Sequence, residues 1–179
     1  METVSHSLLS CVLTLLLAGC VWNKNSPRSL PVLMVQRLSW MDEVAMAKQA
    51  KSLPITDPVR EAELLRTMTQ RGVAAGLKAE NVRRFFTGQM LAAKVVQEEW
   101  RRQHPHGSSS TKAAPDLTLT VRPALDELGQ QMISLLAQPR SPAESAAILN
   151  QARQRLVHAG YSEAAIQPAL AGLQSGLAP

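Results

Sequence analysis

The chain has 179 residues, of which 45% are hydrophobic and 3% aromatic, and its formal net charge is +5. This length suits a single domain, the apolar content excludes a largely disordered chain, and the abundance of Ala, Leu, Gln and Arg favours helix over sheet. The basic residues are scattered, without a long Lys/Arg run. We therefore predict no nucleic-acid partner, whereas a small anion or no specific partner would fit this charge.

The first twenty residues predict export. Residues 8–19, LLSCVLTLLLAG, form an apolar run too short to span a bilayer, and the polar stretch NKNSPRSLP follows soon after. We predict a signal peptide over residues 1–19 and a linker over 20–29. The run ends in Leu-Ala-Gly-Cys, which looks like a bacterial lipobox with Cys20 as the acylated residue, while ordinary cleavage and an uncleaved anchor are the alternatives. We expect a periplasmic protein, either free or attached to the outer membrane as a lipoprotein through Cys20.

Two helices are predicted before residue 77. The first runs from about Leu30 to Ser52, where the stretch SLPITDP breaks it. Asp57 followed by Pro58 is typical of a helix start, because Asp accepts free backbone N–H groups and Pro needs no donor in the first turn. The second helix then extends towards Gly76, which can adopt a left-handed cap.

A third helix is predicted from about Ala79 to Gln103, because an apolar stripe with helical spacing runs along it. Residues 104–116, HPHGSSSTKAAPD, have the composition of a flexible connector. Apart from LTLTV at residues 117–121, the chain shows no strand-like alternation longer than four residues. A fourth helix follows to about Leu135 and tolerates Pro123 in its first turn. The stripe of the third helix consists of Val82, Phe86, Gln89, Ala93, Val96 and Trp100.

The C-terminal residues 136–179 carry two further helix signals. Ser141 and Glu144 form a capping box that opens a fifth helix, which ends near Gly160. A sixth helix begins at Ser162, and Pro168 is expected to kink or divide it. The whole chain therefore predicts an all-α fold, a single bundle of about six helices.

Metal and nucleophile motifs are missing from the sequence. His6 lies in the predicted signal, His104 and His106 lie in the connector, and His158 stands alone, so no metal site is predicted. The serines of GSSST lack a partnered base and are interpreted as connector. No cofactor is predicted either.

Two cations extend the inward stripe of the first helix. Arg37 and Lys48 are eleven residues apart, which is three helical turns plus about 20°, so both point the same way about 16 Å apart. A buried charge needs a partner. Both side chains could reach the surface or pair with Asp57 and Glu61 across the turn, and periodicity alone does not exclude this account.

Three motifs around these cations carry a family resemblance. RLxxMxxVAxxK, LPIxDPVRE and FFxxQMxAAKxVQ resemble the exported, or gamma, branch of the all-helical (type II) chorismate mutases. The likeness covers about residues 30–135 well and the C-terminal helices loosely. It implies one active site enclosed within a single chain, and it implies that Arg37 and Lys48 grip the carboxylates of chorismate. Lys48 would also contact the ether oxygen.

The resemblance assigns further roles to the second and later helices. Asp57, Arg60 and Glu61 match the residues that hold the ring hydroxyl and carboxylate region. Gln97 matches the Gln or Glu that hydrogen-bonds the ether oxygen, and Arg122 matches the Arg that closes the site within one chain. Two positions depart from the family pattern. Ala93 stands where relatives carry a hydroxyl residue, so one carboxylate contact is missing or comes from a backbone N–H, and Leu64 stands where one exported relative has Gln.

The resemblance implies a chorismate mutase, an isomerase of aromatic amino acid biosynthesis that rearranges chorismate to prephenate. Lys48, Gln97 and Arg37 would be its catalytic residues, and the enzyme would work by restricting the substrate's conformation and stabilising the breaking ether bond. One alternative is a same-fold enzyme that eliminates pyruvate from isochorismate. The other is a lipid-anchored helical adaptor, which would expose an apolar patch. The sequence leaves open whether the chain forms a homodimer.

Overall fold

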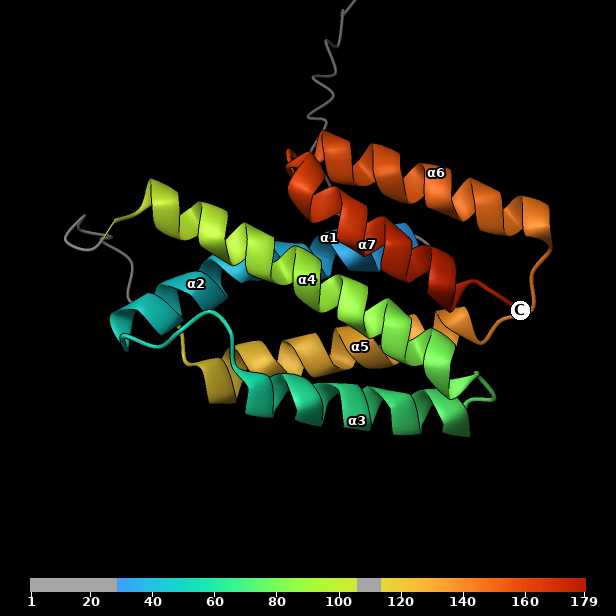
Figure 1. Cartoon of the computed structure of the whole chain (residues 1–179), viewed down its shortest axis with the longest axis horizontal. Coiled ribbons are helices and arrows are strands. Elements are labelled where there is room, and N and C mark those ends of the chain that lie inside the picture. The colour runs from blue at the N-terminus through green and yellow to red at the C-terminus, as the bar shows by residue number, and fades with distance from the viewer. Residues whose placement is uncertain (1–28, 106–113) are drawn as a thin grey trace, which may run out of the picture.

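A computed structural model describes residues 29–105 and 114–179, and helices account for most of both ranges (Figure 1). The predicted signal peptide, Cys20 and residues 106–113 of the connector lie outside the described residues. The all-α bundle expected from the sequence is confirmed, with no strand in the described ranges. The helices are α1 (Leu30–Ser39), α2 (Met41–Ala50), α3 (Pro58–Ala74), α4 (Ala79–Gln103), the π-helix η1 (Leu117–Val121), α5 (Arg122–Leu136), α6 (Pro142–His158) and α7 (Glu163–Gly176).

The predicted first helix is divided into α1 and α2, so the prediction of one helix over residues 30–52 was wrong in detail. The Ser39 hydroxyl donates a hydrogen bond to the Gln36 carbonyl oxygen at 2.8 Å, a contact that competes with regular helix bonding. Trp40 separates the two segments but keeps near-helical angles, φ −75° and ψ −9°. The inward stripe therefore continues across the break. α2 ends at Ala50, and Ser52 has a left-handed φ of +51°.

The predicted helix caps are confirmed. The Arg60 backbone N–H donates to Asp57 Oδ1 at 3.1 Å at the start of α3. Gly76 has φ +87°, which favours glycine, and Ser141 and Glu144 form both hydrogen bonds of a capping box at the start of α6. The Ser162 hydroxyl accepts from Ala165 N at 3.3 Å and opens α7. Local sequence therefore determines where most of these helices begin.

Residues 117–121 form one turn of π-helix rather than a strand. Asp116 caps this turn, since its Oδ1 accepts from Thr118 N at 2.7 Å and from Leu119 N at 2.8 Å. The turn buries Leu117 and Val121 and continues directly into α5. The two apolar side chains of η1 therefore lie next to the first residues of α5.

Pro168 was expected to kink or divide the last helix, and it does not divide it, because α7 is continuous through this residue. Around Pro168, α7 packs closely against α4. A Cβ added at Gly88 of α4 would lie 2.4 Å from the Pro168 carbonyl oxygen and 2.7 Å from Gly172 Cα. α7 therefore approaches α4 almost backbone to backbone, and burial against α4 offsets the single hydrogen bond that Pro168 cannot donate.

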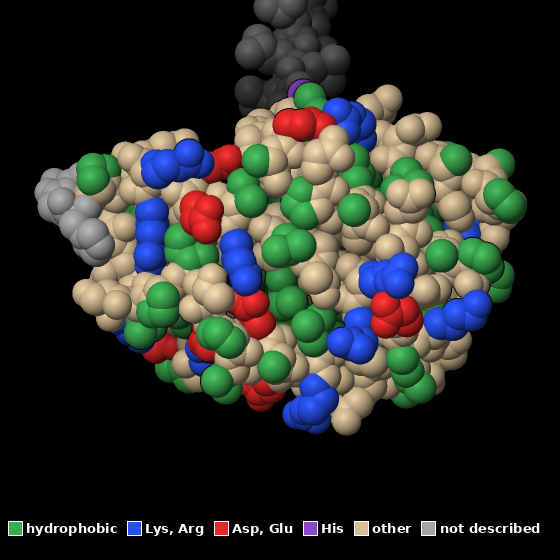
Figure 2. Space-filling model, in the orientation of Figure 1, with side chains coloured by type: hydrophobic (Ala, Val, Ile, Leu, Met, Phe, Trp, Pro, Cys, Tyr) green, Lys and Arg blue, Asp and Glu red, His purple; other side chains and the backbone are tan. Residues whose placement is uncertain are grey.

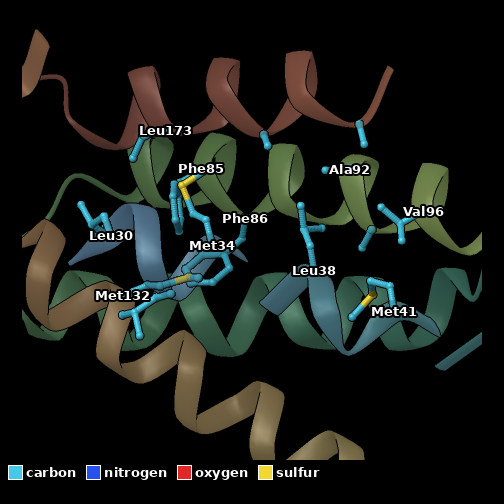
Figure 3. Packing of buried hydrophobic residues seen from close by; sticks show 14 of the residues in the cluster. Leu30, Met34, Leu38, Met41, Phe85, Phe86, Ala92, Val96, Met132 and Leu173 are labelled. Atoms are coloured by element: carbon cyan, nitrogen blue, oxygen red, sulfur yellow. The ribbon is translucent and has the colours of Figure 1, made fainter. Parts of the chain in front are cut away.

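α4 is the central helix of the bundle. Figure 1 shows it between α3 below and α6 and α7 above, with α1 behind it. Figure 3 shows side chains from α1, α4, α5 and α7 meeting in one core, where Phe85 and Phe86 contact edge to face at 4.9 Å between ring centroids. None of the helices in the described ranges has both the length and the apolar composition of a membrane span. On the face shown in Figure 2, acidic and basic side chains lie among the hydrophobic ones. Buried members of this core include Leu33, Met34, Leu38, Phe85, Phe86, Met132, Ile133 and Leu173.

Candidate active site

A pocket of about 130 Å³ lies between α1, α2, the start of α3, α4, η1 and the start of α5. It is formed by segments far apart in sequence, which meet because α4 crosses the others. Every residue predicted for the substrate site lies on its wall, and Leu64, to which the sequence assigned no role, lies there too. The predicted residues on the wall are Arg37, Lys48, Asp57, Arg60, Glu61, Ala93, Gln97 and Arg122.

Arg37 is the most deeply buried cation of the pocket, with 4% of its surface exposed. Its Nη1 donates to the Leu125 carbonyl oxygen at 3.5 Å, a long contact, and its Nε is buried without a partner. Burial lowers the pKa of the guanidinium from its ordinary value to about 10, and the nearby Asp126 carboxylate opposes this shift. Arg37 therefore does not reach the surface and keeps donor capacity for an anion.

Lys48 is half-buried on α2, and its Nζ donates to the Ile55 carbonyl oxygen of the loop before α3. Burial lowers the pKa of this ammonium, while Asp57 and Glu61 raise it in part. One of its three N–H donors is used by Ile55, which leaves capacity for a ligand. The two cations on the inward stripe thus face one cavity.

The start of α3 supplies a second group of charges. Glu61 accepts from the Asp57 backbone N–H at 3.2 Å and forms an ion pair with Lys94 at 2.7 Å. The ion pair of Glu61 is thus made with Lys94 of α4, not with Lys48 as the alternative account proposed. Arg60 forms an ion pair with Glu63 at 2.7 Å and lies 3.8 Å from Asp126.

Gln97 and Ala93 lie one turn apart on α4. Gln97 is 5% exposed, and its Nε2 donates to the Ala93 carbonyl oxygen at 3.0 Å. The second contact of Nε2 is weak, 3.6 Å to Met41 Sδ. Its Oε1 is buried without a partner. A polar group with spare capacity therefore lies beside the apolar Ala93, where no hydroxyl is available.

Arg122 lies at the first residue of α5, immediately after η1. Its Nη1 donates to the Thr118 hydroxyl at 3.4 Å, in an exposed contact. The π-turn therefore orients both its own apolar residues and the cation that follows it. Arg122 is a cation of the pocket wall that a ligand could recruit.

Sequence reasoning missed several residues of the wall. Lys94 follows Ala93 within the motif FFxxQMxAAKxVQ, yet it received no role. Asp126 lies four residues after Arg122, so the helical spacing placed it on the same face. Leu117 was missed too, because LTLTV alternates like a strand rather than with helical spacing.

The charges of the pocket wall do not cancel. Five cations and three carboxylates line it, which gives a formal charge of +2. A positive, largely apolar cavity favours a small dianion. Among residues 29–105 and 114–179 no group of three His, Cys, Asp or Glu side chains is arranged to hold a metal ion. The cations are Arg37, Lys48, Arg60, Lys94 and Arg122, and the carboxylates are Asp57, Glu61 and Asp126.

Comparisons with known proteins agree with this arrangement. A family model described as chorismate mutase type II matches residues 28–98. The crystal structure of chorismate mutase from Burkholderia thailandensis aligns with a TM-score of 0.66 and 31% sequence identity, over 83% of this chain and 96% of that one. This chain belongs to the chorismate mutase family.

Two curated chorismate mutases are also similar. The secreted chorismate mutase of Yersinia pestis is 27% identical over 131 residues, which is 68% of each chain. The monofunctional chorismate mutase of Enterobacter agglomerans is 32% identical over 110 residues, covering 62% of this chain and 60% of that protein. The family and the isomerase class predicted from the sequence are thereby confirmed.

Proposed function

We propose that this pocket binds chorismate and catalyses its rearrangement to prephenate. The observation that carries the proposal is the convergence of Arg37, Lys48 and Gln97 on one positively charged cavity, with buried Nε and Oε1 atoms still unpartnered. Membership of the chorismate mutase family supports the same reaction. The pocket carries a formal charge of +2, and chorismate is a dianion.

The rearrangement is intramolecular. A C–O bond of the ether breaks while a C–C bond forms within the same molecule, so no atom enters or leaves. The reaction requires no nucleophile or general base. Catalysis must come from holding the flexible dianion in a compact chair-like conformer and from stabilising the negative charge that grows on the ether oxygen.

Three arginines can act as clamps for the two carboxylates. Arg37 approaches from α1, Arg60 from α3 and Arg122 from α5, so they surround the cavity from different helices. A guanidinium offers paired N–H donors that match a carboxylate, and burial strengthens this attraction. With both carboxylates held, the substrate loses most of its conformational freedom before the bond breaks.

Lys48 and Gln97 can serve the ether oxygen. The Gln97 Nε2 has two N–H donors, one used by the Ala93 carbonyl and the other directed only to the weak acceptor Met41 Sδ. An ether oxygen that gains negative charge is a far better acceptor than a thioether. Lys48 adds a compact positive charge. The neutral amide of Gln97 donates at any pH, unlike a Glu, which must be protonated.

Asp57 and Glu61 can hold the ring hydroxyl of the substrate. Glu61 already accepts from the Asp57 backbone N–H and pairs with Lys94, so its carboxylate is fixed at the wall. A fixed acceptor selects one orientation of the ring. Ala93 leaves apolar wall where relatives of the family carry a hydroxyl group, and Leu64 does so where one exported relative carries Gln. The five cations carry the polar recognition instead.

We also propose that the protein is exported to the periplasm and attached to the outer membrane through an acylated Cys20. The lipobox-like run and the likeness to a secreted relative support this proposal. The test is labelling of growing cells with a radioactive fatty acid. Label should enter the wild-type protein, and the Cys20→Ser variant should remain unlabelled. An unlabelled wild-type protein recovered from the periplasm would contradict the anchor but not export.

Loss of the ultraviolet absorbance of chorismate tests the activity directly. The purified chain should convert chorismate and leave isochorismate unchanged. Lys48→Ala should lower kcat/KM by about a hundred- to a thousandfold, because one preorganised donor to developing charge contributes about 3 to 4 kcal/mol. Lys51→Ala, which removes an exposed cation just beyond α2, is the matched control and should keep full activity. Near-normal turnover by Lys48→Ala would exclude Lys48 from the site.

A further inference from the structure

Asp126 is a carboxylate placed among the cations that are proposed to bind carboxylates. It lies on α5 one turn after Arg122, lines the pocket, and exposes 41% of its side chain. Its Oδ1 is 3.8 Å from Arg60 Nη2, which is a loose ion pair. The closer partner of Arg60 is Glu63, at 2.7 Å. Asp126 therefore attracts Arg60 without holding it tightly.

Asp126 also acts on Arg37. Its negative charge is the influence that opposes the burial of the Arg37 guanidinium, and Leu125, its neighbour, accepts the single hydrogen bond of Arg37. One carboxylate thus partly neutralises two cations from two different helices. Because Arg37 Nε stays unpartnered, this neutralisation is incomplete.

We infer, on the basis of the proposed function, that Asp126 is the protein's own counter-ion for Arg37 and Arg60 and weakens the binding of substrate. Before substrate binds, Asp126 offsets part of the cost of burying Arg37. When a substrate carboxylate reaches the same two guanidinium groups, a second negative charge lies beside Asp126, and like charges at this range repel. Asp126 therefore raises KM and speeds release of the dianionic product.

The inference predicts that removing the charge of Asp126 strengthens substrate binding, whereas changes in a pocket wall usually weaken it. If Asp126 instead oriented Arg60 for the substrate, its removal would weaken binding. Asp126→Asn is the cleanest variant, since it removes the charge and keeps the shape. Glu127→Gln is the matched control, because Glu127 is the next residue on α5, is exposed, and contacts Gln131 at 2.7 Å. Both variants change the net charge equally.

Steady-state chorismate kinetics and thermal unfolding of the purified protein test the inference. Asp126→Asn should lower KM about three- to tenfold, as expected for two partly solvated like charges, with little change in kcat. It should also lower the Tm of the substrate-free protein, because Arg37 loses its counter-charge. Glu127→Gln should match the wild type in KM. An unchanged or raised KM in Asp126→Asn would overturn the inference.

Two further measurements separate this inference from the proposed function. Calorimetry with isophthalate, a rigid dicarboxylate that cannot react, should show tighter binding to Asp126→Asn than to the wild type. If Asp126→Asn binds isophthalate more tightly while the wild-type protein does not turn over chorismate, the counter-ion inference stands and the proposed activity falls. If Asp126→Asn turns over chorismate with the KM of the wild type, the inference falls and the activity stands. Should Asp126→Asn not fold, Asp126→Ser provides the same neutral change in a smaller side chain.

Discussion

Replacing Arg37 with methionine should make the protein more stable and almost inactive. Arg37 is 4% exposed, makes one hydrogen bond at 3.5 Å, and has a buried Nε without a partner. The protein therefore buries a cation that water would solvate better. Methionine has a similar length and no charge, so it can fill the same space against Leu125 without this cost.

The pKa of Arg37 sets the size of the expected effect. Burial, opposed in part by Asp126, lowers this pKa from its ordinary value to about 10, which corresponds to about 3 kcal/mol against the charged form at about 1.4 kcal/mol per pKa unit. This figure already includes the attraction to Asp126, and loss of the hydrogen bond to Leu125 removes part of the gain. We expect the free energy of unfolding to rise by about 1 to 3 kcal/mol, with a Tm about 2 to 10 °C higher.

Urea unfolding and the chorismate assay measure both halves of this prediction. Arg37→Met should lower kcat/KM by about a hundredfold or more, because a carboxylate clamp is lost. Arg66→Met is the control, since Arg66 is an exposed cation on α3 that contacts Gln70 at 3.2 Å, and it should change neither quantity much. Lower stability of Arg37→Met would show that the empty pocket accommodates the guanidinium well, and the reasoning from burial would fail.

Two further predictions concern Lys48 and the crossing of α4 with α7. Burial lowers the pKa of Lys48, and the charged form of Lys48 is the active one. kcat/KM should therefore stay level through neutral pH and fall as the pH rises through a value below 10.5. A pH–rate profile that stays level beyond pH 10.5 would refute this. Gly88→Ala should destabilise the protein by about 1 to 3 kcal/mol in urea unfolding, because the new Cβ would lie 2.4 Å from the Pro168 carbonyl oxygen. Gly76→Ala, with no atom within 4 Å of the added Cβ, should show only the cost of its left-handed φ, about 1 kcal/mol.

The sequence predicted helix ends well where short-range hydrogen bonds decide them. Asp57, Ser141 and Ser162 each accept a hydrogen bond from the backbone N–H three residues later, so a short local sequence is enough to mark the start of each helix. The continuity of α7 through Pro168 depends on its close packing against α4. The break at Trp40 accompanies the local hydrogen bond from the Ser39 hydroxyl to the Gln36 carbonyl oxygen. Local propensity predicted neither the continuous helix nor this break.

The candidate site was predictable as a set of positions but not as a network. Helical spacing placed Arg37 and Lys48 on one face, and the family motifs added the other positions. The partner of Glu61 was missed, since Lys94 lies 33 residues away on α4. The position of Asp126 relative to Arg60 likewise depends on how α5 packs beside α3. Ion pairs between helices are set by that packing, which spacing within one helix cannot supply.

The helices that do not line the pocket stabilise the protein against the cost of its buried, unpartnered polar atoms. Arg37 Nε and Gln97 Oε1 are buried without partners, and each such atom costs about 1 to 3 kcal/mol. α6 and α7 contribute no residue to the pocket wall. They instead bury the far side of α4 and α1, where Phe85, Ala92 and Leu173 are fully buried. Fully burying a side chain as large as Phe85 or Leu173 contributes about 1.5 to 3 kcal/mol, so this side of α4 offsets the unsatisfied polar atoms on the other.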